Sequence, residues 1–215
     1  MNDTRRSVAT THRHLGAGLG AGSLAAALAL SWLPVAKSDS PPSAPTITLG
    51  QGSQLWVEGD STLHKYRLDA KELRIVVLAS GGGQGLSDLV AHGSIKTLDV
   101  HVPVRGLTSG ESGLDSNMRS AMKEEQFHDI RFQMDSYQSN AGSLKIKGRL
   151  QIAGVEKSIE LEATAAADGT ALRVTGTTRL LLTDYGIKAP KFMLGTMTVA
   201  NAVDVHFALR LELAH

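Results

Sequence analysis

The C-terminal stretch of the chain alternates between apolar and polar side chains with a period of two. Every second position from 203 to 213 is apolar, while Asp204, His206, Arg210 and Glu212 occupy positions between them. Successive side chains of a β-strand point to opposite faces of a sheet. The alternation therefore predicts a half-buried strand over these residues.

Further segments show the same period, and the connections between them are short. They cover residues 73–77, 98–104, 144–152, 159–163 and 172–174. Amphipathic strands joined by short turns favour antiparallel pairing. A long antiparallel sheet must close or fold over to protect its edges. We therefore predict an all-β fold, an antiparallel β-barrel of about eight strands that is wide enough to hold one small or elongated apolar ligand.

One segment departs from this period. Leu114, Met118 and Met122 lie four residues apart, and Asp115 with Arg119 forms a favourable pair at the same spacing. The pattern predicts a short helix near the mouth of the barrel, with Asp115 as its N-cap. Its methionines suit either a cover over a cavity or the filling of a core.

The N-terminus is different in kind. Residues 15–36 carry no charge, Arg5, Arg6 and Arg13 precede them, and the small residues Ala36 and Ser38 lie at the end of the segment. This order is typical of an export signal, which predicts a periplasmic or secreted protein. The alternative is an uncleaved anchor that tethers the chain to the inner membrane, because 22 uncharged residues can span a bilayer.

These patterns divide the chain into three parts. We expect an export signal or anchor over residues 1–38, a Pro/Ser-rich linker over 39–49, and a barrel domain over 50–215. The chain has 22 Lys and Arg against 21 Asp and Glu, and residues 1–38 hold more basic than acidic residues. The barrel domain is therefore slightly acidic, which gives no electrostatic reason to expect nucleic acid as a partner.

Catalytic and metal-binding patterns are weak. The chain has no cysteine, which excludes disulfides, thiolate nucleophiles and Cys-based metal sites. Asp60, Ser61 and His64 suggest a triad, but neighbours on an extended chain alternate faces and no nucleophile elbow surrounds Ser61. We predict a protein that is not an enzyme, holds no metal and needs no cofactor. A hydrolase using Ser61 and His64 is the least favoured alternative.

Several segments carry a resemblance to a known family. They are Trp56, STLHKY at 61–66, EQFHDIRF at 125–132, LKIKGRLQIAGVEKS at 144–158, TDYGIKAP at 183–190 and MLGTM at 193–197. In their order along residues 50–213, these segments resemble the YceI-like family of exported lipid-binding proteins. The resemblance implies a lipocalin-like barrel whose partner is a hydrophobic lipid, a polyisoprenoid or an isoprenoid quinone.

Alternatives remain open at this point. The barrel core could be filled, so that the protein acts through its surface in an interaction or stress response. Pairing of edge strands could produce a homodimer. Our candidate ligand-binding residues are inward-facing apolar side chains, residues near the mouth and amphipathic side chains that could meet a head group: Trp56, His64, Tyr66, Met118, Met122, Phe127, Phe132, Leu150, Leu161, Tyr185, Phe207 and Leu209.

Overall fold

The computed structural model describes residues 46–81, 85–188, 191–192 and 197–214. They belong to a compact unit that runs from Pro41 to His215. The predicted leader or anchor, and the predicted linker up to residue 45, lie outside the described residues. Among the described residues, no helix is long and apolar enough to cross a membrane.

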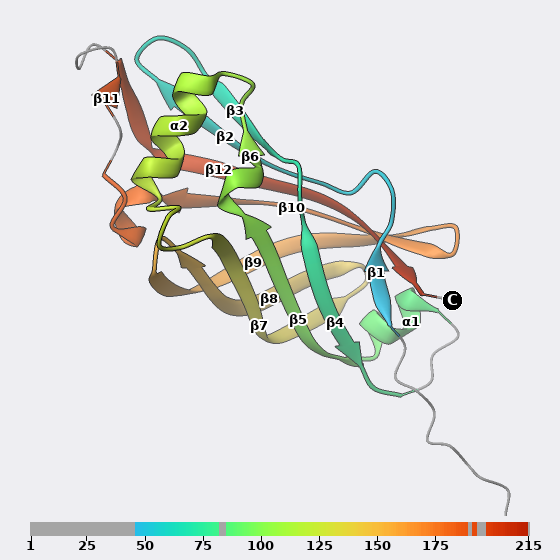
Figure 1. Cartoon of the computed structure of the whole chain (residues 1–215). Coiled ribbons are helices and arrows are strands. Elements are labelled where there is room, and N and C mark those ends of the chain that lie inside the picture. The colour runs from blue at the N-terminus through green and yellow to red at the C-terminus, as the bar shows by residue number, and fades with distance from the viewer. Residues whose placement is uncertain (1–45, 82–84, 189–190, 193–196, 215) are drawn as a thin grey trace, which may run out of the picture. The chain divides into compact units, whose positions relative to one another are not determined.

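A single antiparallel sheet curls around an interior (Figure 1). Ten strands form one continuous path, and β1 (Ile47–Leu49) and β11 (Lys191–Phe192) each pair with β12. In path order the ten are β4 (Arg74–Ala79), β5 (Ile95–Pro103), β7 (Asp129–Asn140), β8 (Ser143–Ile152), β9 (Val155–Asp168), β10 (Ala171–Leu181), β12 (Met197–Leu213), β2 (Gln54–Ser61), β3 (Tyr66–Ala70) and β6 (Leu107–Thr108).

The all-β antiparallel architecture is confirmed, but the expected count of about eight strands is too low. Three runs of extended chain are interrupted, by residues 50–53 between β1 and β2, by 71–73 between β3 and β4, and by the 3-10 turn Val104–Gly106 between β5 and β6. β1 and β2 pair with the same strand, β12, on either side of their interruption. The predicted linker also ends earlier than expected, because residues 47–49 already form β1.

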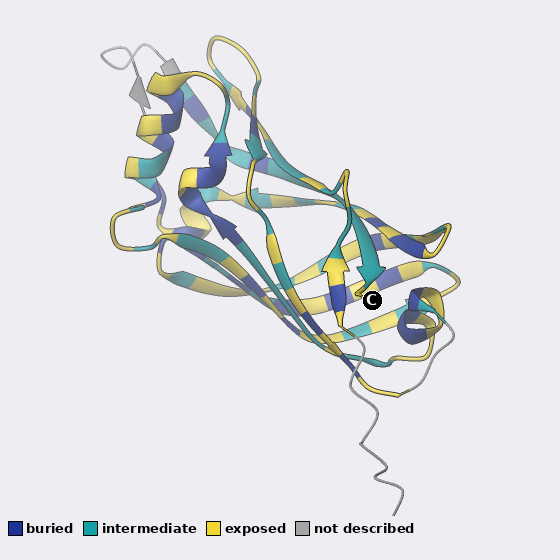
Figure 2. Ribbon diagram, turned by 45° about the vertical axis from the view of Figure 1, so that its right-hand side comes forward, coloured by how far each residue is buried: buried dark blue, intermediate teal, exposed yellow. Residues whose placement is uncertain are grey.

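Buried and more exposed residues alternate along the strands, and the buried side chains form the core (Figure 2). In β8 every second residue from Leu144 to Ile152 is buried, and Gly148 occupies one of these inward positions. The connection from β8 to β9 is the pair Ala153 and Gly154, whose φ angles are 51° and 83°. Two consecutive positive φ angles make a hairpin turn that matches the twist of its strands.

Two short α-helices lie at opposite ends of the curled sheet (Figure 1). Helix α1 (Leu86–Ala91) was not expected, since six residues give too short a period to recognise. Helix α2 (Ser112–Ala121) contains the predicted helical segment, but Glu111 is its N-cap and has no capping side-chain hydrogen bond. The prediction that Asp115 caps this helix is therefore wrong; Asp115 lies inside the first turn.

Both described ends of the barrel lie beside α1. Thr46 bridges to Leu78, and the Ala214 amide donates a 2.8 Å hydrogen bond to the Thr46 carbonyl. The chain therefore enters and leaves the barrel at the end opposite α2 (Figure 1).

Candidate functional site

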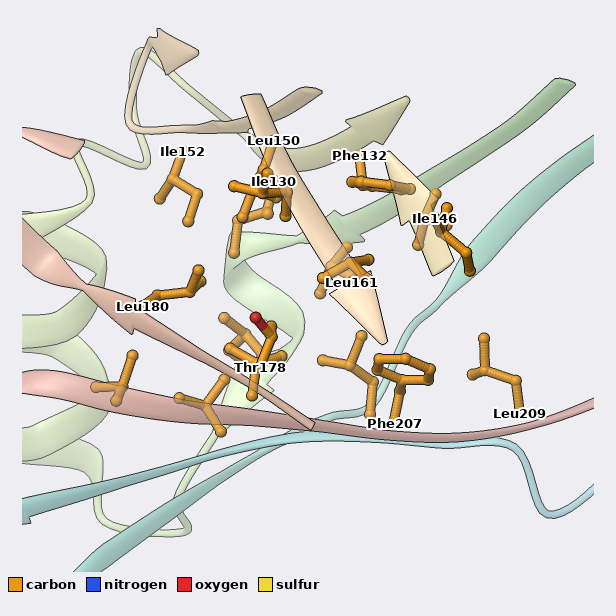
Figure 3. A pocket seen from close by; sticks show the side chains of 18 of the residues that line it. Ile130, Phe132, Ile146, Leu150, Ile152, Leu161, Thr178, Leu180, Phe207 and Leu209 are labelled. Carbon is orange, nitrogen blue, oxygen red and sulfur yellow. The ribbon is translucent and has the colours of Figure 1, made fainter. Parts of the chain in front are cut away.

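The curled sheet encloses a cavity of about 280 Å³. Its wall combines inward-facing side chains of the strands with residues of both helices, and Figure 3 shows part of it. Nearly the whole wall is hydrocarbon, and its polar groups are the hydroxyls of Thr178, Tyr66, Tyr137 and Tyr185. No charged side chain of the described residues lines the cavity. Such a wall favours apolar guests over ionic ones.

Glycines facing aromatic rings keep this cavity open. A Cβ atom at Gly148 would lie only 2.6 Å from Phe132 Cζ, and one at Gly176 would collide with the ring of Phe207. Phe207 is the cross-strand partner of Gly176 in the β10–β12 ladder. Because these glycines have no side chain, both rings can lie along the wall rather than extend across the interior.

At one end, polar contacts hold α1 against the barrel. The Tyr137 hydroxyl lies 3.0 Å from the Val90 carbonyl, to which it donates, and accepts a 3.4 Å hydrogen bond from the Ile95 amide. Burial raises the pKa of Tyr137, while the hydrogen bond from Ile95 acts in the opposite direction. Val90 and Leu86 of α1 line the cavity. This end is thus closed by a helix that a buried hydroxyl holds in place.

At the other end, α2 presents Leu114, Met118 and Met122 to the cavity. Its buried Asp115 carboxylate accepts hydrogen bonds from the Thr108 hydroxyl at 2.5 Å, and from the Ser109 amide and hydroxyl, each at 2.7 Å. Asp115 therefore ties α2 to the end of β6 and to Ser109, which follows that strand.

The ionisation of Asp115 follows from these contacts. Burial raises the pKa of this carboxyl. The hydrogen bonds from Thr108 and Ser109, together with the charge of Arg119, lower the pKa by more than burial raises it, so it lies below its usual range. The carboxylate is therefore ionised at neutral pH, the form that accepts all three hydrogen bonds.

Three hydroxyls of the cavity wall differ from that of Tyr137. Within the described part of the chain, no hydrogen bond satisfies the hydroxyl of Thr178, Tyr66 or Tyr185. Burial, and secondarily the charge of Asp60, raises the pKa of Tyr66 to about 12. Burial, then Asp184, raises the pKa of Tyr185. All three groups are neutral donors near pH 7.

Nine of the twelve candidate ligand-binding residues lie on this wall. They are Tyr66, Met118, Met122, Phe132, Leu150, Leu161, Tyr185, Phe207 and Leu209. The structure thus brings together residues that are more than 140 positions apart in the sequence.

Trp56 lies elsewhere. Its ring stacks on His206 with centroids 5.0 Å apart and an interplanar angle of 7°, and the Arg67 guanidinium lies 4.5 Å from its centroid. Its neighbours in the strand, Leu55 and Val57, are on the cavity wall. Because side chains alternate between the two faces of a strand, Trp56 faces outward and does not contact a ligand inside the barrel.

His64 and Phe127 also lie outside the cavity wall. The Ser61 hydroxyl donates to the His64 carbonyl at 2.6 Å and accepts from the His64 amide at 3.1 Å. It therefore organises the turn between β2 and β3 and is not hydrogen-bonded to the imidazole. Phe127 packs on Gly154. Among the described residues, no three His, Asp or Glu side chains form a metal-binding group.

Sequence reasoning missed Thr178, Tyr137 and the whole of α1 as parts of the wall. Thr178 had a usable signal, since it shares its parity with Val174 and Leu180, which also face inward. Tyr137 and α1 had none, because their contact joins segments that are distant in the sequence.

The fold and site define an antiparallel barrel-like protein whose curled sheet surrounds an apolar cavity. The chain belongs to the YceI-like family, since the model of the YceI-like domain matches residues 67–211. No curated protein sequence matches the chain.

Solved structures share the fold at low sequence identity. BcnA of Burkholderia cenocepacia is 12% identical over 74% of this chain and 95% of its own, with a TM-score of 0.61. A polyisoprenoid-binding domain from Saccharophagus degradans is 13% identical over 80% of this chain and 99% of its own, also with a TM-score of 0.61. The YceI protein of Campylobacter jejuni is 16% identical over 69% and 84%, with a TM-score of 0.54.

Proposed function

We propose that the protein is a non-catalytic carrier or sequestering protein that holds a polyisoprenoid or the isoprenoid tail of a quinone in its cavity. One observation carries this proposal: the interior is an open space of about 280 Å³ whose wall is almost entirely hydrocarbon. The related polyisoprenoid-binding domain of Saccharophagus degradans supports the same class of ligand. The cavity also weighs against the alternative in which a filled core leaves only the outer surface for function.

The energetics of such a site are simple. Transfer of each chain methylene from water to the cavity contributes about 0.8 kcal/mol. A barrel whose backbone is fixed by its ladders loses little conformational entropy on binding. The charged N-terminal flank and the uncharged segment at 15–36 support action outside the cytoplasm, where a water-insoluble chain requires a carrier.

Lipid extraction tests the proposal directly. Protein purified from its native host is extracted with organic solvent, and the extract is examined by mass spectrometry. We expect an isoprenoid lipid in molar proportion to the protein. An extract without lipid, combined with no uptake of a fluorescent farnesol analogue by the purified protein, would contradict the proposal.

A pair of neighbouring substitutions locates the binding. Leu161 lies on the cavity wall, whereas Glu162, the next residue of β9, is exposed. Leu161→Trp should fill the cavity and reduce uptake of the farnesol analogue by tenfold or more, since a chain and an indole cannot share the space. Glu162→Trp adds the same side chain outside and should leave uptake unchanged. Equal uptake by both variants would place the ligand outside the barrel.

A further inference from the structure

Thr178 places a lone hydroxyl on an otherwise apolar part of the wall. It lies in β10 opposite Val205 of β12, and the inward-facing side chains of Val174 and Leu180 lie on either side of it along the strand. Figure 3 shows its oxygen among the hydrocarbon side chains of the cavity. The adjacent Thr177 faces the other way, where its hydroxyl lies 2.9 Å from His206 Nδ1.

This hydroxyl is open to the cavity, since Thr178 is only partly buried and its oxygen is not among the fully buried side-chain atoms that lack a partner. No hydrogen bond to it is formed within the described residues. Valine would fill nearly the same space but would offer no hydrogen-bond donor to a molecule in the cavity. The position therefore presents a free donor to a molecule inside the cavity.

We propose that Thr178 donates a hydrogen bond to an uncharged oxygen of the bound lipid, such as a ketone or quinone carbonyl. This inference rests on the proposed function and specifies its ligand further. The wall lacks any Lys, Arg or His among the described residues, so a phosphate or diphosphate group would be buried without a counter-charge. The oxygen that enters the interior therefore belongs to a neutral group.

The hydroxyls of Tyr66 and Tyr185, which also lack a partner among the described residues, lie toward α2 and cannot take the role of Thr178. Tyr66 packs against Leu114 of α2, and Tyr185 belongs to the 3-10 turn Leu182–Tyr185 that follows β10. Thr178 lies within β10 itself, before this turn. A ligand oxygen at Thr178 is thus inside the barrel, whereas one at the tyrosines would be close to the α2 end.

Two matched ligands test the hydrogen bond. Farnesylacetone carries one ketone on an isoprenoid chain, and the corresponding hydrocarbon has a methylene in place of the carbonyl. We expect Thr178→Val to weaken binding of the ketone about fivefold and to leave binding of the hydrocarbon unchanged. Thr178→Ser, which keeps the hydroxyl, should retain the preference for the ketone. Thr177→Val changes the neighbouring outward position and should alter neither affinity.

The outcomes separate this inference from the proposed function. If neither chain binds the unaltered protein, the proposed function fails and this inference fails with it. If both bind but Thr178→Val changes neither affinity, or weakens both equally, the hydrogen bond is refuted while the apolar cavity stands. If farnesyl phosphate binds inside the barrel as tightly as farnesylacetone, the claim that the ligand oxygen belongs to an uncharged group is wrong.

Discussion

The ring of Phe207 lies over Gly176, its partner across the β10–β12 ladder, in the space that a side chain would otherwise fill. Both residues belong to strands that build the cavity wall, and Phe207 lines the cavity itself. The space available in the cavity therefore depends on Gly176 having no side chain, because even a methyl group there would displace the Phe207 ring. The ring of Phe132 likewise occupies the space beside Gly148, although Phe132 itself pairs with Leu150 across the β7–β8 ladder.

We predict that Gly176→Ala pushes the Phe207 ring into the cavity. The new Cβ would also lie 2.7 Å from the Glu162 carbonyl oxygen, so the backbone must shift as well. We expect the free energy of unfolding to fall by about 1–3 kcal/mol and uptake of a fluorescent farnesol analogue to decrease. Urea unfolding and a binding titration measure the two effects. Gly113→Ala is the control, because a Cβ there meets nothing within 4 Å. Unchanged uptake by Gly176→Ala would show that the ring does not limit the cavity.

The carboxylate of Asp115 should stabilise α2. Asp115→Asn replaces one charged acceptor oxygen with an amide nitrogen, so at least one of the hydrogen bonds from Thr108 and Ser109 is lost. We expect a loss of about 1–3 kcal/mol in the free energy of unfolding and faster amide hydrogen exchange over residues 112–121. Glu111→Gln, an exposed change at the start of the same helix, should have little effect.

The contribution of Asp115 should depend on pH in a defined direction. Its pKa is lowered in the folded protein, despite burial, by the hydrogen bonds from Thr108 and Ser109 and by Arg119. The stabilisation is therefore complete above the unfolded pKa, about 3.9, and is lost as the pH falls through the lower folded value. The difference in stability between the unaltered protein and Asp115→Asn should shrink below about pH 4. A difference that stays constant down to acid unfolding would contradict this account.

Ionisation of the Tyr66 hydroxyl should destabilise the folded protein at alkaline pH. Burial and then Asp60 raise its pKa from 10.0 to about 12, so the unfolded chain loses this proton first as the pH rises. Stability is unaffected below pH 10 and decreases between pH 10 and about 12. Ultraviolet difference spectra should show one tyrosine that ionises late, and Tyr66→Phe should remove it. A spectrum in which Tyr66 ionises with the ordinary pKa would place its hydroxyl in solvent.

The hydroxyl of Tyr137 should hold α1 over its end of the cavity. Tyr137→Phe leaves the Val90 carbonyl and the Ile95 amide without this partner. We expect a loss of about 1 kcal/mol in the free energy of unfolding and faster hydrogen exchange over residues 86–91. Tyr185→Phe is the matched control, since no hydrogen bond is lost there within the described residues. Equal effects of the two substitutions would mean that the ring of Tyr137, not its hydroxyl, holds the helix.

The strands that build most of the wall could be predicted from the sequence, whereas the ends of the barrel could not. Leu150, Leu161 and Phe207 face inward, as their period of two indicates, because alternation is a local property of extended chain. Helix α1 depends on Tyr137, some 47 residues away along the chain, and no local pattern records such a contact.

Errors of detail have a similar cause. Residue type and position predict that Asp115 caps the helix, but its partners are Thr108, the last residue of β6, and Ser109, which follows it. The chemistry of Trp56 suggests a contact with a ligand head group, whereas the parity of Leu55 and Val57 indicates that its side chain lies on the outer face. Residue type alone is thus weaker than parity as a guide to which side chains line a barrel.

The hydrogen bond between the Ala214 amide and the Thr46 carbonyl has a practical consequence. Because both residues lie beside α1, a tag or solid support joined close to Ala214 would be held at that end. Immobilised in this way, the barrel would leave the α2 end free toward the solution. The protein could then serve as an oriented sensor whose lipid-loaded and empty forms are compared on one surface, without the attachment covering the α2 end.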